Sequence, residues 1–261
     1  EKADMASMWL VLGFALLVTL LMRYVLMGVT DPENSKILYI LPLTCIFLIP
    51  TLHRTIMPER FVEHYGGGTW FKAAFLHTFT FLALSFLLVN PPFGDIAAPE
   101  LAKSWTVVAH DGEEIEYPFD VSTKGTTLTW HTNGSTTLQG DAWLLFGLMD
   151  NKNSDGASVE VTREYQANVT TREVNASFWY DNQEAIKNGT SSSNESSPNL
   201  TPHGDQDQPF AIFLGTDLGE GIHKITVVIT EDGDPWENVQ TYYWTLEIIN
   251  ASPFDQESIS E

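Results

Sequence analysis

The sequence predicts three N-terminal transmembrane helices followed by an all-β sandwich domain. Three observations lead to this prediction: long apolar runs within the first 90 residues, a change to alternating apolar and polar residues from Ser104 onward, and an uneven distribution of charge. Residues 1–89 carry six acidic and six basic side chains, so the whole net charge of −21 lies in residues 90–261. Such a difference indicates two different surroundings. A surface this acidic repels nucleic acid, which we exclude as a partner.

The three apolar runs cover residues 6–29, 37–57 and 70–89. Each is close to the length of about 20 helical residues that crosses a hydrocarbon core. The first run lacks a small-residue cleavage site, so we expect a retained anchor rather than a removed signal peptide. Arg23 lies near its end, where a long side chain can extend to the lipid interface. Pro42 and Pro50 lie inside the second run, which we expect to kink, and Pro91 ends the third.

Basic residues in the short connections set the expected orientation. The stretch 50–72, from the end of the second run to the start of the third, carries Arg54, Arg60 and Lys72, whereas the 30–36 connection is mainly acidic. The basic connection is therefore expected in the cytoplasm together with the N-terminus, and everything beyond Asn90 on the extracytoplasmic side. The chain is thus predicted to be a multi-pass protein of the cell membrane, with the lipid bilayer as its first partner.

Residues 1–90 are accordingly assigned to the membrane domain, and the remainder to a linker, one β domain and an acidic tail, at 91–103, 104–250 and 251–261. Within the β domain, residues 181–208 contain no core-forming run, so we expect a long polar loop there. The single cysteine, Cys45, excludes an internal disulfide and favours a prokaryotic or archaeal cell surface.

Period-two alternation predicts eight or nine strands in the β domain. In "EEIEYPFDV", Ile115, Tyr117, Phe119 and Val121 alternate with other residues. The stretch "AWLLFGLM" is continuously apolar and predicts a central strand that is covered on both faces. A further strand is expected at 174–180. The inward-facing residues mix aromatic and β-branched types, as sandwich cores do. They are Tyr117, Phe119, Trp130, Leu144, Phe146, Val161, Phe178, Ile225, Val227, Trp244 and Leu246.

The stretch "GIHKITVVITEDGDP…TYYWTLEII", at 221–249, resembles the final hairpin of immunoglobulin-like and polycystic-kidney-disease-type surface modules. It shares with them a Gly-x-His turn, a Thr/Val strand, an acidic Asp-Gly turn and a last alternating strand. The earlier Trp-x-Phe-Gly-Asp-Gly strand of that family is missing, and "LTWHTNGS" is only a distant counterpart. The resemblance implies an Ig-like sandwich that serves adhesion, spacing or binding, without catalysis.

Seven Asn-x-Ser/Thr triplets, the acceptor signal for N-linked glycans, lie beyond residue 90 and none lies in the membrane part. This asymmetry favours an extracytoplasmic glycoprotein domain. Chance occurrence in a region rich in Asn, Ser and Thr is the alternative for some of the triplets. The candidate acceptors are Asn133, Asn168, Asn175, Asn188, Asn194, Asn199 and Asn250.

One loop has the spacing found at the start of a calcium-binding loop. Asn151, Asn153 and Asp155, followed by Gly156, provide alternate oxygen side chains and a turn. Thr162 stands where such a loop needs a bidentate Glu, which favours an Asx-rich hairpin turn instead.

His53 and His77 lie in the membrane part, where ionisable side chains are candidates for a haem or proton site. The sequence shows no third ligand, and a packed histidine bonded to a neighbouring Thr is the alternative. We therefore expect no cofactor.

No phosphate loop, His-Glu-x-x-His motif or Gly-x-Ser-x-Gly elbow occurs in the sequence. We therefore predict a non-enzymatic, membrane-anchored cell-surface protein that binds a surface ligand or has a structural role. An accessory subunit of a respiratory or transport membrane complex, held by a membrane-protein partner, is the alternative. A sensor input domain is disfavoured because the chain has no cytoplasmic output domain.

Overall fold

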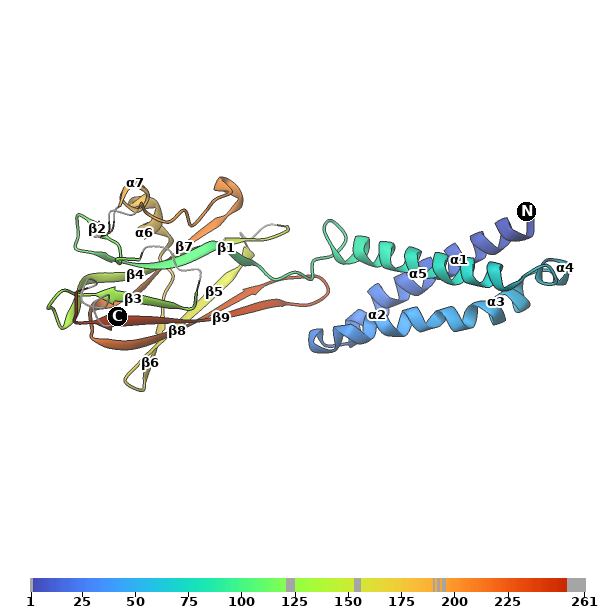
Figure 1. The fold of residues 1–261 in the computed structure, drawn as a ribbon, viewed down its shortest axis with the longest axis horizontal. Coiled ribbons are helices and arrows are strands. Elements are labelled where there is room, and N and C mark those ends of the chain that lie inside the picture. Colours follow the sequence, from blue (N-terminus) through green and yellow to red (C-terminus); the bar gives the residue numbers. More distant parts are fainter. Residues whose placement is uncertain are drawn as a thin grey trace, which may run out of the picture. The chain divides into compact units, whose positions relative to one another are not determined.

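The structure is a computed structural model, and it describes residues 2–120, 125–152, 156–189, 191, 193 and 196–252. The chain forms two compact units, which Figure 1 shows with their elements labelled. The helical unit comprises Glu1–Ile96 and Gly233–Trp236, and the β unit comprises Ala97–Asp232 and Glu237–Glu261. The predicted order of apolar helices followed by a β-rich domain with two sheets is confirmed.

Among the described residues, three helical segments are long and apolar enough to cross a membrane: Lys2–Val29, Pro32–Ile56 and Gly67–Val89. Their elements are α1 (Lys2–Leu21), η1 (Met22–Leu26), η2 (Met27–Val29), η3 (Pro32–Asn34), α2 (Ser35–Thr44), η4 (Cys45–Leu48), α3 (Ile49–Ile56) and α5 (Gly67–Val89), and α4 (Glu59–Val62) precedes α5. The second segment is interrupted, as its prolines predict. The 3₁₀ turn η4 separates α2 from α3, and Pro50 lies in the first turn of α3, where its missing N–H costs nothing.

The helices α1 and α5 bury residues that are spaced mostly four apart. The buried positions are Ser7, Val11, Ala15, Val18 and Thr19 on α1, and Ala73, His77, Phe81, Ser85 and Val89 on α5. Small side chains on such a face allow helices to approach closely in lipid, where van der Waals packing rather than the hydrophobic effect holds them together.

Arg23 is buried near the end of the first apolar segment, and its place at a lipid interface stays a prediction. Its side chain is 3% exposed and forms a 2.7 Å ion pair with Asp234 inside the helical unit. It also donates hydrogen bonds to the carbonyl oxygens of Leu88, at 2.9 Å, and Phe93, at 3.2 Å. The last carbonyls of a helix lack intrahelical donors, and the guanidinium supplies one at the end of α5.

The β unit contains a four-stranded sheet of order β2-β1-β4-β7 and a five-stranded sheet of order β3-β9-β8-β5-β6. The strands are β1 (Glu100–His110), β2 (Ile115–Glu116), β3 (Thr127–His131), β4 (Thr137–Met149), β5 (Ser158–Tyr165), β6 (Asn168–Arg172), β7 (Gln208–Gly219), β8 (Gly221–Glu231) and β9 (Asn238–Ile249). Neighbouring strands run antiparallel except β3 and β9, which are parallel.

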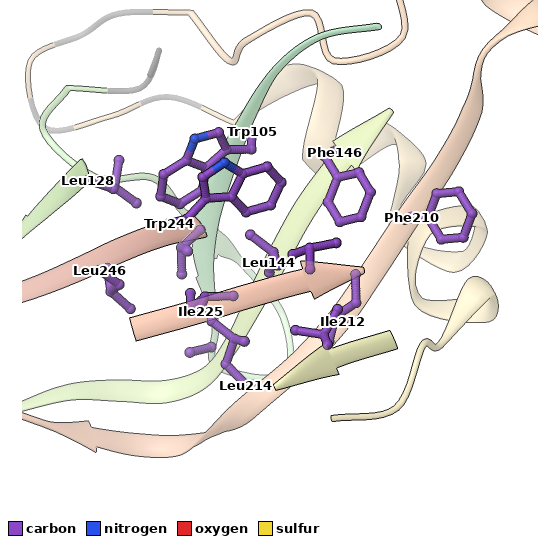
Figure 2. Packing of buried hydrophobic residues seen from close by; sticks show 14 of the residues in the cluster. Trp105, Leu128, Leu144, Phe146, Phe210, Ile212, Leu214, Ile225, Trp244 and Leu246 are labelled. Atoms are coloured by element: carbon purple, nitrogen blue, oxygen red, sulfur yellow. The ribbon is translucent and has the colours of Figure 1, made fainter. Parts of the chain in front are cut away.

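The two sheets face each other across one apolar layer, the inter-sheet core, part of which Figure 2 shows. Trp105 of β1 and Trp244 of β9 stack there, with ring centroids 4.7 Å apart and planes inclined by 6°. Among the predicted inward-facing residues, Trp130, Leu144, Phe146, Val161, Ile225, Val227, Trp244 and Leu246 belong to this core.

A second apolar layer, the outer-face cluster, covers the opposite face of the four-stranded sheet. The helices α6 (Ala176–Asp181) and α7 (Gln183–Asn188) contribute to it (Figure 1). Its buried members are Val108, Ile115, Tyr117, Trp143, Leu145, Phe178, Trp179, Ile186, Leu200 and Ala211. Strand β4 is therefore buried on both faces, as its continuous apolar run predicts.

Two expectations about the outer-face cluster are wrong. Residues 174–180 do not form a strand, because the Asn175 side chain accepts a hydrogen bond from the backbone N–H of Phe178 and caps α6. The polar segment 181–208 does contribute to packing, since Ile186 and Leu200 are buried. Sparse apolar residues were enough because the sheet already supplies the opposing surface.

The strand expected around Ile115 is shorter than its alternation suggests. It contains only Ile115 and Glu116, and Pro118 follows, which has no N–H to donate to a ladder. Tyr117 is buried and its hydroxyl donates to the Ile186 carbonyl at 2.7 Å, whereas Phe119 is only partly buried. Val121 lies outside the described residues.

Candidate functional site

The candidate glycan acceptors lie on the surface wherever the structure describes them. Six of the seven are described and all six are exposed: Asn133, Asn168, Asn175, Asn188, Asn199 and Asn250. Asn194 lies outside the described residues. Asn175 uses its Oδ1 atom for the helix cap, which leaves the Nδ2 atom free of that contact. Their use as acceptors stays a prediction.

The calcium-loop hypothesis falls largely on residues that are not described. Asn151 is exposed, and Asn153 and Asp155 lie outside the described residues. Both the calcium loop and the Asx-rich turn therefore stay predictions, and the sequence favours the turn.

His53 and His77 are buried in the helical unit and bond to different partners. The Nδ1 atom of His53 lies 2.8 Å from the Ile49 carbonyl and its Nε2 atom 2.8 Å from the Ser7 hydroxyl. Because a carbonyl can only accept, Nδ1 carries the proton and the serine donates to Nε2. His77 approaches the Pro42 carbonyl at 3.4 Å. In the described part of the chain, neither histidine joins a group of three His, Cys, Asp or Glu that could hold a metal.

The strongest cluster of polar side chains in the β unit lies on the inner face of β5 and β6, and sequence reasoning missed it. On β5, Arg163 falls in phase with the buried Val161 and with Tyr165. Val161 pairs with Arg172 across the ladder, and Arg163 pairs with Thr170. The two arginines are therefore diagonal neighbours on one face, about 7–8 Å apart.

A histidine and two glycines complete the surroundings of this arginine pair. The ring of His223, on β8, stacks on Tyr165 with a centroid distance of 4.2 Å, and its Nε2 atom donates to the Gly219 carbonyl at 2.8 Å. Gly215 of β7 has a φ of +139°, and a Cβ there would lie 3.4 Å from the Nη1 atom of Arg163. The guanidinium of Arg163 thus extends from the five-stranded sheet to Gly215 in the four-stranded sheet, where the absence of a side chain leaves room for it.

The arginine pair has no counter-ion among the residues that the structure describes. Within the described residues, neither guanidinium forms an ion pair or hydrogen bond, and Nε and Nη1 of Arg163 and Nε of Arg172 are buried without an acceptor. Burial lowers the pKa of both side chains, and the charge of Arg172 lowers the pKa of Arg163 further, against a smaller opposite effect of Tyr165. Burial also lowers the pKa of His223, the hydrogen bond to Gly219 opposes this, and the charge of Arg163 adds to it.

A hollow of about 530 Å³ adjoins Arg172 at the edge of the unit. Asp141, Trp143, Asn175 and Phe213 line it as well. Trp143 is only 8% exposed, and its Nε1–H has no acceptor in the described part of the protein. The hollow therefore combines a guanidinium, an amide and the two carboxylates of Asp141 and Glu173 with aromatic walls, a set that suits a small polar ligand.

A second hollow, of about 550 Å³, has the opposite character. Asp111, Glu113, Glu114 and Glu116 contribute to its lining. Burial and the nearby charge of Asp111 raise the pKa of Glu116. The Asp111 carboxylate already accepts hydrogen bonds from the backbone N–H groups of Glu113 and Glu114, so this acidic group forms a turn of its own.

Two sequence signals could have identified the arginine pair. Arg163 and Arg172 are the only two arginines in residues 90–261, and Arg163 interrupts an inward apolar phase. The pairing register that brings them together follows only from the hairpin between β5 and β6.

Comparison with known proteins identifies no family. No protein-family model and no curated protein matches the chain. One solved structure with weak similarity is that of the CooA pilin subunit from enterotoxigenic Escherichia coli, with 11% sequence identity and a TM-score of 0.20. The match covers 56% of this chain and 99% of the pilin chain.

Proposed function

We propose that the protein is a membrane-anchored cell-surface protein whose β unit binds a ligand or has a structural role outside the membrane, without catalysing a reaction. The observation that carries this proposal is the sharp division of the chain. Residues 1–89, with three apolar helical segments, have no net charge, and residues 90–261, which contain the β unit with its own inter-sheet core, carry the whole net charge of −21.

The distribution of charges and acceptor signals supports an outward-facing β unit. Arg54 near the end of the second apolar segment, Arg60 after it and Lys72 near the start of the third gather at one end of these segments, and basic residues favour the cytoplasmic side. All seven glycan-acceptor triplets lie beyond the third segment, and N-linked glycans are added on the translocated side. An archaeal cell surface fits the acidic composition and the single cysteine.

Labelling of single cysteines on intact cells tests this orientation. In a Cys45→Ser background, Asn133→Cys and Glu63→Cys each place one thiol at an exposed position, one in the β unit and one between the second and third apolar segments. We expect a membrane-impermeant maleimide to label Asn133→Cys on intact cells and Glu63→Cys only after the cells are opened. The reverse pattern would refute the proposed orientation.

The exposed face of α5 favours a second candidate function, an accessory subunit of a membrane complex. Phe71, Phe75 and Phe79 form a stacked row with centroid distances of 6.5 and 6.4 Å, and these side chains are 72%, 64% and 64% exposed. A row of this kind packs against lipid or against the helix of another protein. Extraction in a mild detergent followed by native gel electrophoresis separates the two: a single small species favours the anchor, and a stoichiometric large complex favours the subunit.

A further inference from the structure

The two positive charges of the arginine pair are partly buried, and no described residue of the protein compensates them. Partly buried charges cost free energy unless an opposite charge and hydrogen bonds compensate them. Two guanidiniums side by side also repel each other. Residues 90–261 hold 28 acidic and only seven basic side chains, yet both of their arginines lie together, and no described carboxylate pairs with either.

Carboxylates are close in sequence, but the strand geometry directs them elsewhere. Glu164 follows Arg163, and alternation along β5 places it on the opposite face of the sheet, where it pairs with Lys224 at 3.4 Å. Asp141 lines the hollow beside Arg172, and its carboxylate accepts a 2.5 Å hydrogen bond from the Thr216 hydroxyl. Glu173 lines the same hollow and is exposed. None of the three neutralises the pair.

The location of the pair leaves room for a ligand. Strand β6 is the edge of the five-stranded sheet, so Arg172 has no further strand beside it. The adjoining hollow of about 530 Å³ falls within the range of about 300–1,000 Å³ that is usual for small-molecule sites. Guanidinium groups bind carboxylates and phosphates through paired N–H···O bonds, which a planar donor fork favours.

We propose that Arg172, which lines the hollow beside β6, and Arg163, which lies behind it and adds its positive charge, form a receptor for the oxyanion group, a carboxylate or a phosphate, of an acidic ligand that enters from this hollow. Asn175 and Asp141 are placed to bond the hydroxyl or amine groups next to that oxyanion. This inference names the ligand class for the surface-binding role proposed above, and it rests on that role.

Isothermal titration calorimetry on the full chain in detergent tests the receptor. The probes are sodium phosphate, sodium glucuronate and glucose, at an ionic strength held constant with NaCl so that general screening cannot mimic binding. We expect saturable binding of phosphate or glucuronate and none of glucose. Whichever anion binds more tightly identifies the source of the oxyanion. Arg163→Gln and Arg172→Gln should each weaken binding at least tenfold, and the control Lys224→Gln should leave it unchanged.

Thermal unfolding provides a second readout that a purely structural role of the arginines would not give. Without ligand, Arg163→Gln should raise the melting temperature because it removes an unpaired charge. The bound anion should raise the melting temperature of the unmodified chain by about 3 °C and that of the double variant by nothing.

Three results would overturn the receptor: absence of saturable binding for both anions, equal binding of glucose, or unchanged anion affinity in the Arg163→Gln/Arg172→Gln double variant. These measurements do not depend on orientation in the membrane. Specific binding by a β unit that the cysteine labels place in the cytoplasm would therefore reject the surface role and keep the receptor.

Discussion

Trp244 lies among three other aromatic rings in the inter-sheet core. It is 3% exposed and contacts three aromatic rings, those of Trp105, Phe146 and Tyr242. We expect Trp244→Ala to lower the free energy of unfolding by about 3–5 kcal/mol, because neighbouring rings cannot fill the cavity. Urea unfolding measures this loss. The adjacent Tyr243 is 70% exposed, and Tyr243→Ala is the matched control, expected to change stability by less than about 0.5 kcal/mol. Equal losses in both variants would contradict the assigned faces of β9.

His223 should make the stability of the β unit sensitive to mild acid. Burial holds its pKa in the folded protein below the ordinary value of 6.5. As the pH falls through about 6.5, the unfolded chain gains a proton that folded His223 does not, so the unfolded state is favoured. The loss stops growing once the pH is below the folded pKa.

The measurement compares urea unfolding of the unmodified chain and His223→Gln between about pH 7.5 and 5. Taking the difference between the two chains cancels the many carboxylates that they share. We expect the unmodified chain to lose more stability over this range. Equal losses would mean that His223 does not remain neutral in the fold.

At the level of single residues, the alternation of apolar and polar side chains predicted many of the buried apolar residues, but it did not predict the charged residues that lie among them. Trp130, Val161 and Trp244 are buried as their phase predicts. Arg163 lies two residues after Val161 and therefore on the same face of β5, but a pattern that counts only apolar residues does not identify it. The arginine pair needs a cross-strand register, which local alternation does not contain.

Among the elements, the segment from α6 to Leu200 shows where sequence patterns are weakest. The letters "SFWY" are typical of strands, yet the Asn175 cap and the apolar face of the neighbouring sheet make them a helix. Tertiary contacts override propensity most readily in short elements. The long strands β4, β8 and β9, by contrast, could be predicted because their patterns extend over many residues.

Leu200 is the apolar anchor that holds the polar segment against the four-stranded sheet. It is 2% exposed, and its carbonyl oxygen leaves no room for a Cβ on Gly147. The segment at Leu200 therefore lies very close to β4. We expect Leu200→Ala to reduce the free energy of unfolding by about 2–4 kcal/mol in urea titrations.

The control for this change is Asn199→Gln, produced in a host without glycosylation, because Asn199 is exposed and keeps an amide. We expect it to be neutral. Deletion of residues 185–205 should be destabilising, since it removes Ile186 together with Leu200. A fully stable deletion variant would show that the outer-face cluster contributes nothing to folding.

For the whole molecule, the β unit has the parts needed for independent folding. It contains two hydrophobic clusters, requires no disulfide, and a domain of about 150 residues can bury roughly two-thirds of its surface. We expect residues 97–252, produced without the apolar helices, to give a soluble, β-rich unit with one cooperative urea transition. If circular dichroism shows that the fragment is unfolded at moderate salt, the β unit needs a partner to fold. The accessory-subunit function would then be the better proposal.

The parallel pairing of β3 with β9 has a consequence for the folding of the protein during its synthesis. Thr127 pairs with Thr245, and β9 lies between β3 and β8, so an interior strand of the five-stranded sheet is the last of its strands to be synthesised. Until that strand leaves the ribosome, β3 has no neighbour in its sheet and the face of Trp105 that stacks on Trp244 is open. Contacts this distant in sequence form slowly, and exposed strand edges bind other chains in the meantime. We therefore expect the β unit to complete its fold only after β9 has been synthesised, and a chain that ends before β9 to lack a stable inter-sheet core.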